Sequence, residues 1–304
     1  DHSKVSHDHL QKVEPDSVEK LADGGSVVEL TIDKSVKKCT TVAFCTPHQY
    51  VDVYVDGRDV YSLKETAGRW GHTTGHVWNF VLLPVNTTHL TVKLSPCYPE
   101  TANALLTYYV GNGHEIYMGL MRQSLPTFII SFIILIVGIY MLGYWLLVCK
   151  SEDVDATLLY LGLFSVILGL WTANETDFVK LLLVNQHATT FAAYILLMAM
   201  PIPFVLFVRS FLDFDDKNIW RVFCGFSMVM CVISCVLHFT GIWELRQSLI
   251  LTHIVIVGLL IYLTRAIVFK FVKRQVGRRL RTCIAALILV ILASIADLIN
   301  YYKV

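Results

Sequence analysis

Six long apolar segments between residues 125 and 301 constrain this chain more than any other feature of its sequence. A helix crosses the roughly 30 Å hydrocarbon core of a bilayer with about 20 apolar residues. The segments have about that length and comprise residues 125–148, 156–173, 188–208, 222–240, 249–269 and 282–301. With a mean hydropathy of +0.57, buried helices of a large soluble protein are the less favoured interpretation. The sequence therefore predicts an all-α multi-pass transmembrane bundle over residues 116–304.

Lysine and arginine are concentrated in alternate loops between these segments. The loops after the first, third and fifth segments hold most of them, with a basic run over residues 270–281. The alternate loops and the end of the chain hold only Lys180, Arg246 and Lys303. By the positive-inside rule, the basic loops face the cytoplasm. We therefore expect a multi-pass protein of a plasma membrane with its N-terminal section outside.

The section before the apolar segments has a different pattern. Residues 26–115 contain short alternating apolar runs with turn residues between them, including Asp56-Gly57, which is a strong hairpin signal. This spacing predicts an extracytoplasmic antiparallel β-sandwich, jelly-roll-like in type. Residues 1–25 are polar and lack periodicity, so we expect a flexible leader there.

The predicted sandwich carries a cluster of aromatic and basic side chains near one turn. They are Arg69, Trp70, His72, His76 and Trp78, and we interpret them as the rim of a ligand-binding cleft. His72 and His76 lie four residues apart, but their glycine and threonine neighbours favour a loop, and no acid or thiol lies at ligand spacing. We therefore predict no metal site.

Three cysteines precede the apolar segments, so they cannot all pair within one chain. A disulfide between Cys97 and either Cys39 or Cys45 is one possibility. Three reduced thiols are the alternative.

Polar side chains within or beside the apolar segments are energetically costly and therefore informative. Asn174, Glu175, His253, Asp297 and Asn300 fall toward one side under the predicted topology. They either line an intramembrane pocket or join helices by hydrogen bonds. In the third segment, Pro201 and Pro203 interrupt the helix and are hinge candidates, or mark a bend.

The chain carries no phosphate loop, zinc-protease helix, nucleophile elbow or kinase signature. We expect no enzyme activity, no cofactor and no nucleic-acid partner for this chain. Its expected partner is the lipid bilayer that surrounds the helices. One alternative is a small-solute transporter or channel. Another is an intramembrane enzyme that uses Glu175, His253 and Asp297.

Four segments resemble those of a known family. They are residues 44–57 (FCTPHQYVDVYVDG), 78–84 (WNFVLLP), 170–177 (LWTANETD) and 200–209 (MPIPFVLFVR). These strings are similar to the bacterial seven-transmembrane receptors with diverse intracellular signalling modules, most closely to the GGDEF-linked branch.

The resemblance implies a signal-transduction receptor that senses a small-molecule or carbohydrate ligand outside the cell. Its output would be a cytoplasmic GGDEF diguanylate cyclase, through which it would form a homodimer. The chain departs from the family pattern because it contains neither a seventh helix nor the residues of an output domain. No family ligand residues can be transferred to positions of this chain.

Overall fold

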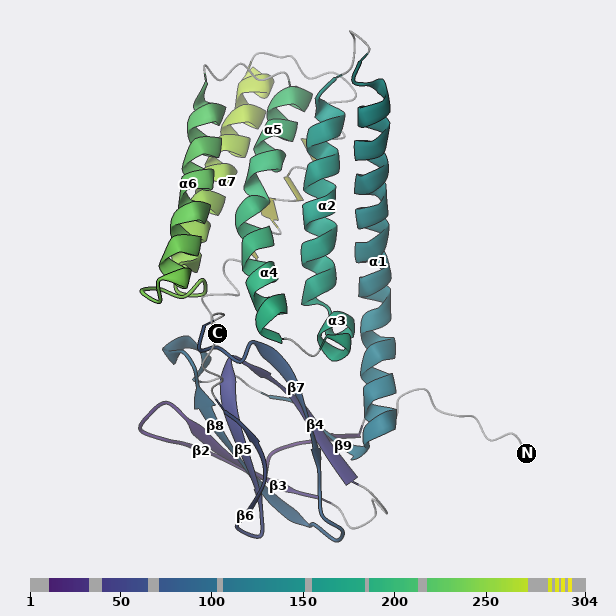
Figure 1. Cartoon of the computed structure of the whole chain (residues 1–304), viewed down its shortest axis with the longest axis vertical. Helices are drawn as coiled ribbons and strands as arrows, with labels where there is room; N and C mark the ends of the chain where they lie inside the picture. The colour runs from purple at the N-terminus through teal and green to yellow at the C-terminus, as the bar shows by residue number, and fades with distance from the viewer. Residues whose placement is uncertain are drawn as a thin grey trace, which may run out of the picture. The chain divides into compact units, whose positions relative to one another are not determined.

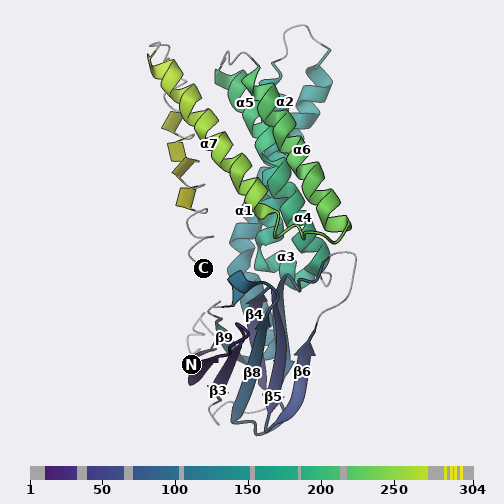
Figure 2. The same cartoon turned by 90° about the vertical axis from the view of Figure 1, so that its left-hand side faces the viewer.

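The computed structural model describes residues 11–32, 40–64, 71–102, 106–150, 155–183, 186–212 and 218–272. It also describes four short helical pieces at 284–285, 288–289, 291–292 and 295–296. The chain divides into two compact units. The first comprises residues 1–128, 174–190 and 304, and the second comprises residues 129–173 and 191–303. Figures 1 and 2 show the strands of the first unit and the helices of the second.

The strands of the described residues form two antiparallel sheets (Figure 1). The first sheet contains, in spatial order, β1 (Gln11–Val13), β9 (Tyr108–Asn112), β4 (Thr40–Pro47) and β7 (His76–Leu82). The second contains β2 (Ser17–Lys20), β3 (Ser26–Thr31), β8 (His89–Pro96), β5 (Gln49–Val55) and β6 (Arg58–Leu63). A short 3-10 helix, η1 (Pro99–Thr101), follows β8. The two antiparallel sheets confirm the predicted sandwich.

The predicted flexible leader is wrong for residues 11–13 and 17–20. β1 pairs with β9, and β2 pairs with β3, so both are part of the sheets. Neither strand has an alternating apolar pattern in its sequence. β2 is also exposed along its whole length. Their partners in the sheets, and not their own hydrophobicity, determine that they are strands.

The sandwich core follows the alternation of each strand. Every second residue of β5 is buried, and Val51 and Val53 have no exposed surface. β8 contributes Leu90, Val92 and Leu94 to the same cluster. Asp56 and Gly57, between β5 and β6, both have positive φ angles, as a tight hairpin turn requires. The hairpin predicted at these two residues is confirmed.

The side chain of Asn79 is polar and lies inside this apolar core. Asn79 of β7 is fully buried, and its amide donates to the hydroxyl of Thr46 at 2.9 Å and to the carbonyl of Val77 at 3.2 Å. Its Oδ1 accepts a hydrogen bond from the Tyr61 hydroxyl at 2.9 Å. Because Tyr61 belongs to β6, this bond joins the two sheets. Partners on both sheets explain why an amide is tolerated in this position.

The helices of the described residues follow directly. They are α1 (Gly113–Val148), α2 (Thr157–Glu175), α3 (Asp177–Leu182), α4 (Gln186–Ala199), α5 (Pro201–Leu212), α6 (Ile219–Phe239) and α7 (Leu249–Val272). When α4 and α5 are counted together, five helical segments of the described chain are long and apolar enough to cross a membrane. They correspond to the first five predicted segments. Most of the sixth, 282–301, lies outside the described residues, although its four described pieces are helical.

Helix α1 begins immediately after the last strand. β9 ends at Asn112, and α1 starts at Gly113 and continues without a break to Val148. The Asn112 side chain accepts the backbone N–H of His114 at 3.0 Å, which satisfies one of the free donors at the helix start. The first helix thus begins well before residue 125, where its apolar segment was predicted to start.

The third predicted segment is interrupted at its prolines. α4 ends at Ala199 and α5 begins at Pro201, where a missing N–H costs no hydrogen bond. The interruption expected from Pro201 and Pro203 is therefore present, and its action as a hinge stays a prediction. α5 is central to the helical unit, since Val205 and Val208 are fully buried in a cluster with Leu263 of α7.

Glycines allow α1 and α2 to pack closely. A Cβ atom on Gly169 would lie 2.7 Å from the backbone nitrogen of Leu135, and one on Gly138 would lie 2.8 Å from that of Val166. These are backbone atoms, which cannot move aside as the end of a flexible side chain can. Small residues are a common means of close helix packing in membranes.

Candidate functional site

The outer face of the first sheet is apolar and is covered by helices. Ala43 of β4 and Tyr109 of β9 are buried together with Ile116 and Leu120 from the first turns of α1. Trp78, Phe80 and Leu181 are partly buried against this group. We call these seven residues the sheet–helix interface. A sheet face that meets solvent usually carries polar residues. Because this face is apolar, the helices that cover it are an integral part of the fold.

Helix α3 is attached to this interface by a hydrogen bond. The indole Nε1–H of Trp78 donates to Oδ1 of Asp177, the first residue of α3, at 3.0 Å. Thr176 caps the helix, because its hydroxyl accepts the backbone N–H of Val179. A carboxylate in the first turn of a helix also interacts favourably with the helix dipole. Asp177 therefore orients α3 and bonds to the sheet.

The carboxylate of Asp177 influences two neighbouring groups. Cys45 pairs across the strands with Trp78, and burial together with the charge of Asp177 raises the pKa of its thiol from 9.0 to about 12. The nearby charge of Lys180 partly opposes this shift. Burial, with a smaller effect of Asp177, also raises the pKa of the Tyr109 hydroxyl. Both groups thus stay neutral at physiological pH.

The segment from Asn174 to Thr190 forms a compact connection of its own. The Asn174 amide donates to the carbonyl of Thr189 at 2.9 Å, and Glu175 pairs with Lys180 at 3.3 Å. The Gln186 amide donates to the carbonyls of Lys180 and Leu183. These bonds tie the end of α2, the whole of α3 and the start of α4 together.

This connection also contacts α1. The rings of Phe128 in α1 and Phe178 in α3 are stacked with centroids 4.4 Å apart. Leu181 packs from α3 onto the sheet–helix interface. α1, α2 and α4 all extend from this compact unit into the helical unit. The sandwich is consequently packed against the ends of two helices that continue into that unit, α1 and α4, and is bonded to α3, which follows α2.

A second contact joins a sandwich loop to the first turn of α4. Gly75 has a φ of +78°, and a Cβ atom there would lie 2.5 Å from the hydroxyl oxygen of Thr190 and 3.3 Å from the carbonyl of Gln186. The carbonyl of Gly75 accepts the N–H of His48 at 2.7 Å. Only glycine therefore fits between the loop and the helix at this position.

Buried polar contacts hold this loop in place. The imidazole of His48 bonds to the hydroxyl of Thr73, and the ring of His76 lies edge-on to it with centroids 5.0 Å apart. The Thr74 hydroxyl donates to the carbonyl of Gln49 at 3.1 Å, and the Tyr50 hydroxyl donates to that of His72 at 2.8 Å. The loop is thus fixed by the starts of β5 and β7 on one side and by α4 on the other.

The predicted ligand-binding residues have different positions. His72 is exposed, His76 is half-buried beside His48, and Trp78 belongs to the sheet–helix interface. Arg69 and Trp70 lie outside the described residues. A common cleft for these five side chains thus stays a prediction. Within the residues that the structure describes, no three His, Cys, Asp or Glu side chains gather as a metal site would require.

The predicted intramembrane residues are also distributed. Asn174 and Glu175 bond to the connection before α4, as described above. His253 lies in α7, while Asp297 and Asn300 lie outside the described residues. The bonds of Asn174 and Glu175 are local links at helix ends, and a pocket shared by all five residues stays a prediction.

Of the two disulfides predicted as alternatives, the one between Cys45 and Cys97 is not formed. Cys45 is a partly buried free thiol on the first sheet. Cys39 lies outside the described residues, so a bond between Cys39 and Cys97 stays a prediction.

Sequence reasoning did not identify Asp177 and Leu181 as parts of an interface. Their helix, α3, has six residues and no apolar run of membrane-spanning length. The available signal was the combination of a capping threonine, an acid and two apolar residues in a loop between apolar segments.

A comparison with known protein families identifies the family of the membrane-spanning part of the chain. A family model described as 7TM diverse intracellular signalling matches residues 124–304, more than half of the chain. No curated protein matches the chain. The match covers the membrane-spanning helices, and members of the family are multi-pass membrane receptors that signal. The chain therefore belongs to the seven-transmembrane receptors with diverse intracellular signalling.

Proposed function

We propose that the sandwich is an extracytoplasmic sensor domain and that the sheet–helix interface transmits its state to the membrane helices. The observation that carries this proposal is the hydrogen bond between Trp78 and Asp177, which attaches a strand to the start of α3. Ile116 and Leu120 extend the same interface onto α1, whose helix continues to Val148. A shift of the first sheet would therefore alter two helix ends together.

The proposed stimulus is a small molecule or carbohydrate. The loop over residues 71–75 supports this, because it presents an exposed His72 and has Gly75 directly against Thr190 of α4. A ligand that moves this loop would press on α4, and the interruption at Pro201 is the point at which α4 and α5 could change their angle. Ligand binding would then shift the populations of two helix arrangements.

The proposed output is a cytoplasmic module of the GGDEF diguanylate cyclase type, as the resemblance described above implies. Such a module would act as a homodimer, and the chain described here would have a regulatory and not a catalytic role. Family membership favours this reading over a transporter, a channel or an intramembrane enzyme. Solute flux through proteoliposomes that contain the chain would favour a transporter.

The test uses the whole gene product in a bacterium that reports cyclic di-GMP. Trp78→Phe and Asp177→Ala each remove one side of the same hydrogen bond, so both should change the basal cyclic di-GMP level in the same direction. Trp243→Phe is the matched control, since Trp243 is nearly half exposed after α6 and lies far along the chain from the interface. Opposite changes in the two interface variants would contradict transmission through this bond. A wild-type protein that produces no cyclic di-GMP would contradict the cyclase output alone.

The orientation is tested separately with cysteine labelling in intact cells. Glu29→Cys places a thiol on an exposed strand position, whereas the native Cys149 is exposed after α1. A membrane-impermeant maleimide should label position 29 and leave Cys149 unlabelled until the cells are opened. The reverse pattern would invert the proposed topology.

A further inference from the structure

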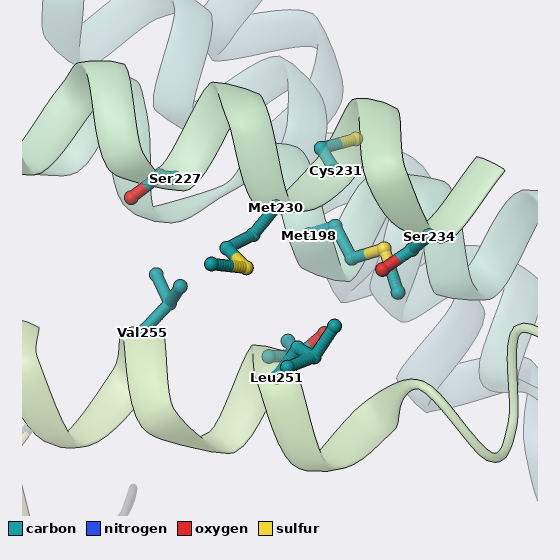
Figure 3. Close-up of a pocket in the computed structure, with 8 residues that line it drawn as sticks. Met198, Ser227, Met230, Cys231, Ser234, Leu251 and Val255 are labelled. Carbon is teal, nitrogen blue, oxygen red and sulfur yellow. The ribbon is translucent and has the colours of Figure 1, made fainter. Parts of the chain in front are cut away.

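A small cavity lies among α4, α6 and α7. Its wall is formed by Met198, Ser227, Met230, Cys231, Ser234, Leu251, Thr252 and Val255. Figure 3 shows Ser227, Cys231 and Ser234 along α6 and Leu251 and Val255 along α7, with the side chain of Met230 extending from α6 toward α7. About 10 Å³ is open to the centre of a water-sized sphere, which is enough for about one water molecule.

The polar groups of this wall differ in their hydrogen bonding. Ser227 is buried, and its hydroxyl donates to the carbonyl of Phe223 one turn earlier at 2.9 Å. Ser234 is 1% exposed, and its hydroxyl has no hydrogen-bond partner in the structure as described. A buried hydroxyl without a partner is costly, and an ordered water in a space of this size supplies the missing bond where polar groups line it.

A second buried polar atom lies one turn further along the same face of α6. The Nδ1 atom of His238 accepts the backbone N–H of Leu245 at 3.4 Å, so the proton of the neutral ring is on Nε2. That Nε2 atom is buried and, among the described residues, has no partner. Residues four apart share one face of a helix. Two buried polar atoms one turn apart on this face of α6, the Ser234 hydroxyl and Nε2 of His238, therefore have no hydrogen-bond partner among the described residues.

We infer that the cavity is a hydration site in which one ordered water bonds to the hydroxyl of Ser234. Thr252, 3% exposed on the opposite wall, brings a second hydroxyl from α7 to the same space. The water bridges α6 and α7 at this level. A bridging water can exchange partners without breaking apolar packing, so the two helices keep a polar contact that tolerates small relative shifts. This inference does not depend on the proposed ligand or output.

The test is hydroxyl-radical footprinting of the purified protein in nanodiscs. Radicals formed from an ordered water oxidise the nearest side chains, and methionine is oxidised readily to its sulfoxide. Met198 is only 5% exposed, so its oxidation together with that of Met230 reports on water inside the cavity. Ser234→Ala removes the proposed water ligand. Ser227→Ala is the matched control, because it changes the same wall by the same atom but removes a hydroxyl that already has a partner.

In the wild-type protein, the half-buried Met230 should be oxidised, and so should Met198 despite its burial. Ser234→Ala should lower their oxidation about threefold or more, while Ser227→Ala leaves it near the wild-type rate. Met118 of α1, which is 39% exposed, serves as the reference for an intact fold. Cavity methionines that resist oxidation in the wild type, or equal effects of the two variants, would overturn the inference. A dry cavity would also reveal itself by a higher melting temperature of Ser234→Ala, because that change would remove an unsatisfied hydroxyl.

Discussion

Trp78 and Asp177 are 99 residues apart in sequence, and their side chains meet at 3.0 Å. The strand that carries Trp78 belongs to the sandwich, while Asp177 begins the short helix that follows the second membrane-spanning segment. This bond therefore joins a strand of the sandwich to a helix that lies far away in the sequence. Apolar packing by Leu181 beside it excludes water from part of the contact.

A double-mutant cycle measures the strength of this bond. Trp78→Phe keeps an aromatic ring without the donor, and Asp177→Ala removes the acceptor. We expect a coupling free energy of about 1–2 kcal/mol, since the acceptor is charged but the site is partly open to solvent. Unfolding of the full chain in detergent, followed by denaturant titration, provides the four stabilities. Additive effects within about 0.3 kcal/mol would mean that the two residues are not coupled.

Cys45 should react slowly with alkylating reagents in the folded protein. Burial and the charge of Asp177 raise the pKa of its thiol to about 12, so very little thiolate is present near pH 8. Below pH 9, the thiol keeps its proton in both the folded and the unfolded protein. Between pH 9 and about 12, only the unfolded protein loses this proton, so the free energy of unfolding decreases as the pH rises through that range.

Mass spectrometry of the native protein treated with iodoacetamide measures the alkylation of Cys45. The exposed Cys149 provides the comparison within the same sample. Asp177→Ala should accelerate alkylation of Cys45 at pH 10, because it removes one cause of the raised pKa. Alkylation of Cys45 as rapid as that of Cys149 at pH 8 would show that the thiol is not buried in solution.

Replacement of Asn79 should be among the most destabilising changes in the sandwich. Asn79→Leu removes the acceptor of the Tyr61 hydroxyl and the donor to the Thr46 hydroxyl, which keeps, among the described residues, only its bond to the carbonyl of Val77 at 3.5 Å. We expect a loss of about 2–4 kcal/mol in the free energy of unfolding. Tyr61→Phe removes only one of these bonds and should cost about 1 kcal/mol. Chemical denaturation of the full chain compares the two, and a smaller effect of Asn79→Leu than of Tyr61→Phe would contradict this account.

Two glycine substitutions separate close packing from helix propensity. Gly169→Ala places a methyl group 2.7 Å from the backbone of Leu135, so α1 and α2 must separate, at a cost of about 1–3 kcal/mol. Gly225→Ala is the control, because a Cβ atom there meets nothing within 4 Å. It should be neutral or stabilising by up to about 1 kcal/mol. Titration with a denaturing detergent measures both, and equal stabilities would exclude tight packing at Gly169.

Some elements could be predicted because their cause is local. An apolar run of about 20 residues has few alternatives to a membrane-spanning helix, and a proline cannot donate the hydrogen bond that would continue one. The interruption at Pro201 and the hairpin at Asp56-Gly57 were thus predictable. β1 and β2 were not, since polar residues such as Gln11 and Lys12 form a strand only when a partner strand such as β9 is present.

The site was less accessible to prediction than the fold. Trp78 was selected from the sequence as a ligand-binding residue, but its side chain bonds to α3 and packs in the sheet–helix interface. No sequence period relates a tryptophan on a strand to an aspartate in a distant loop. The hydroxyl of Ser234 likewise has the same sequence signal as that of Ser227, although only one of them lacks a partner among the described residues.

The sequence by itself determined the division into a β-rich section and apolar helices, because hydrophobic period and segment length depend only on neighbouring residues. The tertiary structure alone decided that Trp78 and Asp177 meet, that Gly75 lies against Thr190, and that α4, α6 and α7 leave room for a water molecule. The physical reason is that contacts between distant segments depend on the packing of whole elements, and the position of each element is set by many side chains at once.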